Sequence, residues 1–396
     1  MTNHVCEYLI IGGGLAGASA VEGIRERDAR GDIILIGSER HLPYDRPPLS
    51  KKLWFGKKEV KDIFLHDRFF YERNGVTLLE NCRAMALDPE NKTVVDNRGL
   101  THRFNKLLLA TGGVPLTLRV PGGMQSGICY YRTLDDYLLT RKKAAAGRTA
   151  VVVGGGFIGS EMAAALCANG LRVVMIYPDA WLCARVFTKE IGLTMERLFD
   201  ERGIRMLKGQ APVAFENNGG GLVMHASGGE RVAADLVIAG IGIKASAELA
   251  EHAGLAVHDG VIVNAHLQSA HPDIYAAGDV ARFPYQVLGH QTRVEHWDNA
   301  AMQGRCAGRN MAGAHEAYTH MPYFFSDLFE FGYEAVGEVS TLLETVADWK
   351  KPLEQGVIYY LREGKIRGAM MCNVWDKVDA ARAMIQRGAT AEERLQ

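Results

Sequence analysis

Residues 8–17 read Tyr8-Leu9-Ile10-Ile11-Gly12-Gly13-Gly14-Leu15-Ala16-Gly17, and this segment decides the fold of the chain. Its four apolar residues predict a short buried strand, and the glycine spacing that follows predicts the start of a helix. We expect this helix to extend to about Arg30, where Gly31 stops it, and a second apolar strand to occupy residues 32–36. A strand, a helix and a parallel strand in this order form the βαβ unit that binds dinucleotides.

The same pattern occurs a second time, 142 residues further along the chain. Residues 150–153 form the apolar strand, and residues 154–159 read Gly-Gly-Gly-Phe-Ile-Gly. A helix is expected up to Ala168, followed by a strand over residues 172–177. A single glycine motif is weak evidence, but two copies in the same strand-and-helix context indicate two Rossmann-like domains.

Each glycine of the motif has its own physical task. The first permits a tight turn, the second lets the backbone approach a pyrophosphate, and the third lets helix and strand pack closely. An acidic residue for the ribose should follow about 20 residues later, and Glu39 lies 22 residues after Gly17 while Asp179 lies 20 residues after Gly159. The two loops predict nucleotide contacts at Gly12, Gly13, Gly14, Ala16 and Gly17, and at Gly154, Gly156, Phe157, Ile158 and Gly159.

The second acidic residue also indicates which nicotinamide nucleotide is preferred. The Asp179 carboxylate is able to accept hydrogen bonds from a free 2′-hydroxyl but repels a 2′-phosphate, which favours NADH over NADPH. Arg185 would weaken this preference if its side chain folded back toward the ribose. The alternative is that Arg185 is a solvated surface charge.

Composition excludes several classes of protein. The 396 residues carry a net charge of -1, so no overall field attracts nucleic acid or an anionic membrane. No apolar run reaches the roughly 18 residues that cross a bilayer, and we expect a cytoplasmic protein without a membrane span. The seven cysteines show no short metal-ligand spacing and are expected to be reduced, mostly buried thiols, so no metal site is predicted.

The remaining pattern divides the chain into three predicted domains. Apolar strands are expected at residues 106–110, 236–241 and 274–277, and each runs into a turn. After about Tyr323 the strands become short and alternating, and residues 357–361 and 366–371 form a hairpin signal. We therefore predict an α/β protein with a discontinuous first nucleotide domain, a second nucleotide domain and a C-terminal α+β domain, which occupy residues 1–115 with 245–320, 116–244 and 321–396, respectively.

Four further segments carry a family resemblance. Residues 42–51 read Leu-Pro-Tyr-Asp-Arg-Pro-Pro-Leu-Ser-Lys, residues 294–298 read Val-Glu-His-Trp-Asp, residues 332–335 read Gly-Tyr-Glu-Ala, and residues 356–362 read Gly-Val-Ile-Tyr-Tyr-Leu-Arg. With the glycine motifs, they make the chain similar to apoptosis-inducing factor and its prokaryotic relatives over nearly its whole length. These proteins lie within the glutathione-reductase-like flavoproteins, which include the ferredoxin reductases of bacterial oxygenases.

The resemblance implies an FAD-dependent oxidoreductase that takes hydride from NADH. FAD would occupy the first glycine loop and NADH the second. Further FAD contacts are implied at Glu39, Arg46, Lys51, Arg132 and Asp279, and positions near the isoalloxazine at His296, Trp297 and Phe325. Further NADH contacts are implied at Asp179, Gly242, Glu295 and Glu334, and Arg185 is a further candidate residue of this site.

The chain departs from the family pattern in three places. Phe325 stands where the family has a tryptophan, and Trp297 stands where it has a second histidine, so stacking is retained while the flavin potential and its accessibility are open to change. The long insertion of the eukaryotic factor is missing between Trp349 and Gly356, which weakens any transfer of its signalling role.

Four residues are predicted to take part in catalysis. We expect Lys51 and Glu161 to form an ion pair near flavin N5, where the lysine would stabilise negative charge on the reduced flavin. Phe157 is a predicted lid over the nicotinamide site, and His296 is predicted to tune the flavin or hydrogen bond near the nicotinamide. The alternatives are a solvated lysine, a carboxylate favoured by a helix N-terminus, ordinary helix packing and a structural histidine, respectively.

The electron acceptor is expected to lie outside the chain. Disulfide reductases and peroxidases of this superfamily keep their redox cysteines close after the first glycine loop, yet residues 40–60 contain no cysteine. A ferredoxin or other iron-sulfur protein, a quinone, a dye or oxygen are the acceptors that remain. The alternative function is a redox-sensing protein that holds NADH tightly against reduced FAD and signals by forming a homodimer.

Overall fold

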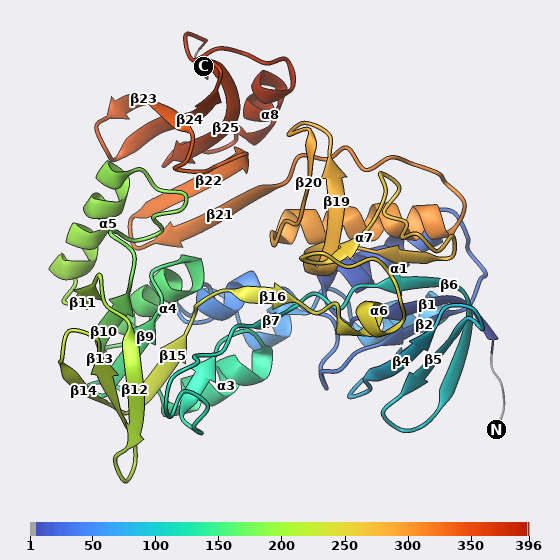
Figure 1. Cartoon of the computed structure of the whole chain (residues 1–396), viewed down its shortest axis with the longest axis horizontal. Helices are drawn as coiled ribbons and strands as arrows, with labels where there is room; N and C mark the ends of the chain where they lie inside the picture. The colour runs from blue at the N-terminus through green and yellow to red at the C-terminus, as the bar shows by residue number, and fades with distance from the viewer. Residues whose placement is uncertain (1–4, 394, 396) are drawn as a thin grey trace. The chain divides into compact units, whose positions relative to one another are not determined.

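The computed structural model describes residues 5–393 and residue 395. The chain forms two compact units, each assembled from three separate segments. Unit 1 contains Met1–Asp45, Lys61–Val114 and Lys244–Tyr323, and unit 2 contains Arg46–Val60, Pro115–Ile243 and Phe324–Gln396. Figure 1 shows the elements of both.

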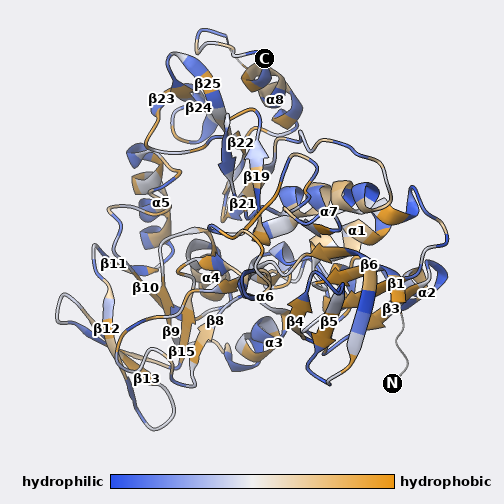
Figure 2. Cartoon of the chain, turned by 45° about the vertical axis from the view of Figure 1, so that its right-hand side comes forward, coloured by the Kyte–Doolittle hydropathy of each residue, from blue (hydrophilic) through white to orange (hydrophobic). Residues whose placement is uncertain are grey.

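Unit 1 is built around a seven-stranded sheet with the order β3-β2-β1-β6-β5-β4, in which β18 also pairs with β6. The strands β3, β2, β1, β6 and β18 are mutually parallel, whereas β4 and β5 form an antiparallel extension. The apolar strands appear orange in Figure 2, as expected for a parallel sheet covered on both faces. The strand bounds are β1 Val5–Ile11, β2 Ile33–Ile36, β3 Val76–Leu79, β4 Ala84–Asp88, β5 Thr93–Asp96, β6 Thr101–Leu109 and β18 Ile274–Ala276.

Helices α1 and α7 of unit 1 pack closely against each other. Helix α1 spans Leu15–Arg25 and α7 spans Trp297–Met311. Small residues permit the close approach, since a side chain at Gly304 would strike the backbone oxygen of Ala16. The N-terminus of α1 is thereby held at the carboxyl end of β1.

The prediction that the first helix extends to about Arg30 is wrong, because α1 ends at Arg25. The Asp28 carboxylate accepts hydrogen bonds from the backbone N–H groups of Arg30 and Gly31, which form a turn in place of a further helical turn. Arg25 stabilises the same turn by donating to the carbonyls of Asp28 and Gly31. Local side-chain hydrogen bonds of this kind compete with helix propagation.

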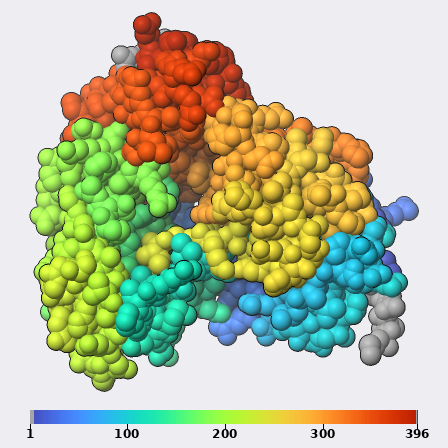
Figure 3. Space-filling model, viewed as in Figure 1, coloured from blue at the N-terminus to red at the C-terminus, as the bar shows by residue number. Residues whose placement is uncertain are grey.

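The other elements of unit 1 are short. In Figure 3 the later part of the unit, coloured yellow to orange, lies beside the β4–β5 hairpin, coloured cyan, and Figure 1 shows α6 near these strands. A three-stranded sheet has the order β17-β19-β20. The bounds are η2 Val60–Ile63, α2 Arg68–Arg73, α6 Glu248–His252, β17 Val261–Ile262, η3 Gly278–Val280, β19 Ala281–Tyr285 and β20 His290–Thr292.

Unit 2 repeats the parallel architecture with a five-stranded sheet in the order β11-β10-β9-β15-β8. A three-stranded antiparallel sheet, β12-β13-β14, joins the same apolar core through Phe215 and Met224. The bounds are η1 Pro47–Ser50, β8 Ile128–Tyr130, α3 Leu134–Lys143, β9 Thr149–Val153, α4 Phe157–Ala168, β10 Arg172–Tyr177, α5 Lys189–Glu201, β11 Arg205–Lys208, β12 Pro212–Asn217, β13 Leu222–Ala226, β14 Arg231–Ala234 and β15 Leu236–Ala239.

The last part of unit 2 is an antiparallel sheet with the order β21-β22-β25-β24-β23 and one helix, which we call the C-terminal module. The expected hairpin is present, with its turn at Glu363 and Gly364. The bounds are β21 Tyr323–Leu328, β22 Phe331–Gly337, β23 Glu344–Lys351, β24 Gln355–Arg362, β25 Lys365–Cys372 and α8 Val378–Gln386. The predicted fold class, two Rossmann-like parts and a C-terminal α+β part, is confirmed.

The compact units do not follow the predicted domain limits. Strands β7 Gly113–Pro115 and β16 Ile243–Ala245, where the chain crosses between units, pair in a two-stranded sheet. The sequence pattern places residues 46–60 in the first nucleotide domain, yet they belong to compact unit 2. The division into three domains stays a prediction. Within residues 5–393 and 395, no helix is long and apolar enough to cross a membrane.

Candidate functional sites

The first glycine loop has the geometry that its motif predicts. Gly12 has a φ of 129°, a conformation that strains residues with a side chain, and a Cβ there would strike the backbone oxygen of Ala110. A Cβ on Gly17 would strike the oxygen of Gly12. The turn and the close helix packing therefore both require glycine.

The second glycine loop repeats this construction. Gly154 has a φ of 114°, and a Cβ there would strike the oxygen of Gly240. Gly159 packs on Gly154 as Gly17 packs on Gly12. Strand β9 pairs in parallel with both β10 and β15, so this loop also lies at the carboxyl edge of a parallel sheet.

The middle glycine of each loop faces open space. A Cβ built on Gly14 or on Gly156 would meet no atom within 4 Å. Both residues are helix N-caps, and neither α1 nor α4 has a side-chain cap hydrogen bond there. Free N–H groups and the helix dipole make such an end a site for an anion, and the open glycine leaves room for one to approach. The residues therefore fit a dinucleotide pyrophosphate at each loop.

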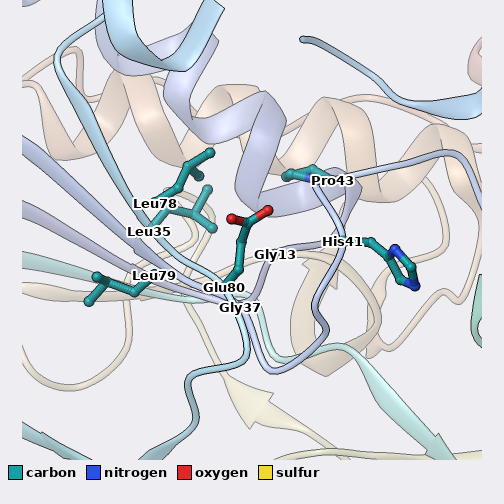
Figure 4. A pocket seen from close by; sticks show the side chains of 8 residues that line it. All are labelled: Gly13, Leu35, Gly37, His41, Pro43, Leu78, Leu79 and Glu80. Carbon is teal, nitrogen blue, oxygen red and sulfur yellow. The ribbon is translucent and has the colours of Figure 1, made fainter. Parts of the chain in front are cut away.

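A small hollow adjoins the first loop at the carboxyl ends of β2 and β3, and Figure 4 shows the side chains that line it. Ligands of open α/β sheets bind at this edge of the sheet. Glu39 lies in the same region, between the lining residues Gly37 and His41, and its carboxylate accepts a hydrogen bond of 2.6 Å from Tyr44. The hollow is lined by Gly13, Leu35, Gly37, His41, Pro43, Leu78, Leu79 and Glu80.

Asp279 lies at the same edge of unit 1 as the first loop. It follows β18, which runs parallel to β6, and a Cβ on the preceding residue, Gly278, would approach Ala16 of α1 within 3.1 Å. The buried side chain of Gln303 accepts a hydrogen bond of 2.9 Å from the Gly278 N–H. The structure thus brings Asp279 and the first glycine loop together, as the sequence predicts.

Sequence reasoning missed Arg293, which connects two of the predicted residues. Its side chain is 9% exposed and donates hydrogen bonds to the Asp279 carbonyl and to the Glu295 carboxylate, at 3.1 and 2.6 Å. Burial alone would lower the pKa of Arg293, but the charges of Glu295 and Asp259 raise it. The spacing of two residues between Arg293 and Glu295 was the available sequence signal.

His296 and Trp297 lie at the N-terminus of α7. Burial lowers the pKa of His296 from 6.5 to about 4, against the opposing charges of Asp279 and Asp298. The imidazole is therefore neutral at pH 7. Trp297 is partly exposed, and its indole N–H donates to the Asp45 carboxylate at 2.7 Å.

In unit 2, Asp179 lies just beyond β10 with its carboxylate exposed, as a residue that meets ribose hydroxyls should be. Arg185 is also exposed, six residues further along the loop. Ile158 is partly exposed on the first turn of α4. Gly242, with a φ of 101°, accepts a hydrogen bond from the Leu116 N–H.

Lys51 and Glu161 form the predicted ion pair. The Lys51 ammonium lies 3.0 Å from the Glu161 carboxylate, and the two side chains are 11% and 6% exposed. The ammonium also donates to the Phe325 carbonyl at 3.1 Å and lies 4.6 Å from the centre of the Phe325 ring. Lys51 is therefore not a solvated lysine, and Glu161 is more than a carboxylate that a helix N-terminus favours.

Two serines that the sequence reasoning missed complete this cluster. Ser50 donates to one oxygen of Glu161 at 2.5 Å, and Ser326 donates to the other. Both serines are buried. A buried carboxylate is costly unless it is paired and hydrogen-bonded, and Glu161 receives a cation and two hydroxyls. Each serine adjoins a predicted residue, Lys51 or Phe325, and this adjacency was the signal.

Phe157 contacts the C-terminal module. It is the first residue of α4, and its ring centre lies 5.3 Å from that of Phe324.

Glu334 lies on β22, where burial, followed by the charge of Asp376, raises its pKa. Within the described part of the chain, its Oε2 has no hydrogen-bond partner. A buried acceptor without a partner fits a ligand that donates a hydrogen bond.

Arg46 and Arg132 also come together in unit 2. The Arg46 guanidinium donates to the Arg132 carbonyl at 2.9 Å, and the Arg132 N–H donates to Asp136 in the first turn of α3. The hydrogen bond to the Arg132 carbonyl therefore holds the Arg46 side chain beside Arg132.

The thiols take no part in a disulfide or a metal cluster. All seven cysteines are free, and five of them are buried. Burial raises the pKa of Cys183 to about 12 and that of Cys372 to about 12, so these thiols stay protonated at neutral pH. Within residues 5–393 and 395, no cluster of His, Cys, Asp or Glu is suited to a metal ion.

Comparison with protein families gives two matches along the chain. Residues 6–304 match the pyridine nucleotide-disulphide oxidoreductase model. Residues 307–355 match the model of the C-terminal region of mitochondrion-associated apoptosis-inducing factor. The first match includes both glycine loops, and the second lies largely in the C-terminal module.

Individual relatives cover almost the whole chain. The ferredoxin–NAD(+) reductase component of the anthranilate 1,2-dioxygenase system of Burkholderia cepacia is 34% identical, over 96% of this chain and 94% of the relative. Apoptosis-inducing factor 1 of Dictyostelium discoideum is 31% identical, over 98% and 79%. The putidaredoxin reductase of a covalent complex with putidaredoxin superimposes with a TM-score of 0.92 at 30% identity, over 97% and 93%. The predicted resemblance and the predicted class of oxidoreductase are confirmed.

The ion pair generates a first prediction. Replacing Lys51 by Ala should slow the reduction of bound flavin by NADH roughly tenfold to a hundredfold, because a positioned cation stabilises charge that develops during reaction. Anaerobic stopped-flow absorbance measures this rate. Lys52→Ala is the matched control, since Lys52 is the exposed neighbour. Equal rates in Lys51→Ala and the control, at equal flavin content, would contradict the role.

The buried histidine generates a second prediction. Because the pKa of His296 is lowered to about 4, the unfolded chain binds a proton here that the folded chain does not, between about pH 6.5 and 4. The free energy of unfolding should therefore fall as the pH is lowered through this range, and His296→Gln should lose less. Urea unfolding at pH 7.5 and 5 measures the difference. His252→Gln replaces an exposed histidine and is the control, whose unfolding free energy should change with pH as that of the unmodified protein does. If His296→Gln also showed the unmodified pH dependence, the prediction would be contradicted.

Proposed function

The chain belongs to the pyridine nucleotide-disulphide oxidoreductase family, and from this membership we propose that it is an FAD-containing enzyme that oxidises NADH and reduces a ferredoxin. One observation carries the proposal. Both glycine loops have the same construction, with an open middle glycine at an uncapped helix N-terminus. Two sites of this kind suit two dinucleotides.

FAD is assigned to unit 1 and NADH to unit 2. In unit 1, the loop Gly12–Gly17, Glu39 and Asp279 share one edge of the sheet, and Glu39 would meet the adenosine ribose. In unit 2, the loop Gly154–Gly159 precedes Asp179, whose exposed carboxylate suits the 2′-hydroxyl of NADH. When bound, FAD accepts hydride from NADH and releases electrons singly or in pairs.

The protein supplies position and charge for this chemistry. Lys51 is held rigidly by Glu161 and by the Phe325 carbonyl, so its ammonium is a fixed positive charge. Such a charge stabilises the negative charge that a flavin gains on reduction. In this proposal Phe157 covers the nicotinamide position at the second loop. The neutral imidazole of His296 donates or accepts a hydrogen bond without adding charge.

The electrons must leave to another molecule. The family name refers to a disulphide, but residues 40–60 contain no cysteine and all seven thiols are free. An internal disulfide relay after the first loop is therefore not available to this chain. A ferredoxin is the acceptor that the relatives favour, since one is named as a ferredoxin–NAD(+) reductase and another was captured with putidaredoxin.

An electron-acceptor screen tests the function. FAD-loaded protein is mixed with NADH and with a ferredoxin, a quinone or ferricyanide, and NADH oxidation is followed at 340 nm. Fast turnover with the ferredoxin supports the proposal. Turnover with ferricyanide alone would show an NADH-oxidising flavoprotein with a different partner, and no flavin reduction by NADH would overturn the proposal.

A second candidate function is favoured by the match to the apoptosis-inducing factor C-terminal model. It is a redox sensor that keeps NAD bound to reduced FAD and forms a homodimer. Anaerobic NADH titration with size-exclusion chromatography separates the two. A lasting long-wavelength absorbance with a doubled mass supports the sensor, whereas an unchanged mass with fast ferredoxin turnover supports the reductase. Either function is compatible with the proposed cytoplasmic location.

The nucleotide preference generates a third prediction. Asp179→Ala should raise kcat/KM for NADPH relative to NADH at least about tenfold, because the carboxylate that repels the 2′-phosphate is removed. Steady-state kinetics with ferricyanide and both nucleotides measure the ratio. Asp200→Ala removes an exposed carboxylate on α5 and should leave the ratio unchanged. An unaltered ratio in Asp179→Ala would place the discrimination elsewhere.

A further inference from the structure

A tight turn at residues 183–187 lies beside the second glycine loop. The Cys183 carbonyl accepts hydrogen bonds from the N–H groups of Val186 and Phe187, both at 2.9 Å. Cys183 has a φ of 51°, which is uncommon for a residue with a side chain. Such a conformation persists only where the surrounding structure holds it.

The turn is attached directly to the glycine loop. The Cys183 N–H donates to the Gly155 carbonyl at 2.8 Å, and Gly155 immediately precedes the open N-cap glycine of α4. The Cys183 thiol lies 3.9 Å from the Ser160 hydroxyl on the first turn of α4. A shift of the turn would therefore move the backbone that faces the pyrophosphate.

The C-terminal module holds the other side of the turn. Thr341 donates from its hydroxyl to the Ala184 carbonyl at 2.8 Å and from its N–H to the Arg185 carbonyl at 3.0 Å. The fully buried Tyr360 donates to the Val186 carbonyl at 2.5 Å. Three consecutive carbonyls thus accept hydrogen bonds from the module.

Phe187, at the end of the turn, makes two further contacts. The Phe187 carbonyl accepts from the Trp181 indole at 2.9 Å, and the Phe187 ring packs against Tyr333 of β22 with a centroid distance of 5.2 Å. Backbone carbonyls that are shielded from water need such partners, because an unpaired polar group is costly to bury. The module supplies most of the partners that the turn requires.

We propose that Tyr360 and Thr341 of the C-terminal module are positioning residues for nucleotide binding at the second glycine loop. They act through the 183–187 turn, which fixes Gly155 on one side and carries Arg185 on the other. This inference rests on the proposed function, since it takes the second loop as the NADH site. It assigns the module a role in the affinity for the adenosine-pyrophosphate half of the nucleotide.

The test measures NAD+ binding to the FAD-loaded protein by isothermal titration calorimetry. Tyr360→Phe removes only the hydroxyl and should raise the Kd for NAD+ roughly threefold to tenfold. Thr341→Val keeps the backbone donor and should raise the Kd less. With NADH as substrate, KM should rise in both variants while kcat at saturation stays within about twofold.

Tyr359→Phe is the matched control. Tyr359 is equally buried on the same strand, but as the adjacent strand residue it faces the opposite side of the sheet, where its hydroxyl accepts from the Leu395 N–H. It should bind NAD+ as the unmodified protein does, even if both variants lose thermal stability. Equal Kd values for Tyr360→Phe, Thr341→Val and the unmodified protein would overturn the inference, and so would an equal loss in Tyr359→Phe. If the unmodified protein bound no NAD+, the proposed function itself would fail.

Discussion

The buried carboxylate of Glu161 is the constraint on which the organisation of unit 2 depends. A charge in this environment must be neutralised and hydrogen-bonded, or the fold loses several kcal/mol. Lys51, Ser50 and Ser326 meet this need. Because two of them lie in residues 46–60, that segment is tied to α4, and it belongs to compact unit 2 although the sequence around it belongs to unit 1. The same demand attaches Ser326, at the start of the C-terminal module, to the second nucleotide-binding part.

The two glycine loops are alike in their own geometry but are supported in different ways. In unit 1, α7 packs on α1 through Gly304, and Gln303 fixes Gly278 beside the first loop. In unit 2, the second loop is held through the turn at residues 183–187, which the C-terminal module anchors. A helix end that binds an anion must be rigid to be effective. A duplicated local motif has therefore acquired two unrelated supports.

The thiols and the charged side chains bear on the chemistry of the chain as much as the glycine loops do. The cysteines are protonated, mostly buried thiols rather than a redox pair, so electrons have no internal disulfide to enter. In unit 2 the Lys51 ammonium is fixed by Glu161, and in unit 1 burial keeps the His296 imidazole neutral. Without an internal disulfide, the oxidoreductase that we propose passes its electrons to an external partner.

The sequence by itself determined both βαβ units, the glycine turns within them and the C-terminal hairpin. Glycine spacing and apolar runs reflect local geometry, which is why these predictions needed no tertiary contacts. Only the tertiary structure decided that α1 stops at Arg25, that Ser50 and Ser326 complete the Glu161 cluster, and that Tyr360 reaches the Val186 carbonyl. The contacts of these serines and of Tyr360 join residues more than 100 positions apart. No local pattern encodes them, because a hydrogen bond across such a distance depends on where packing places both of its ends.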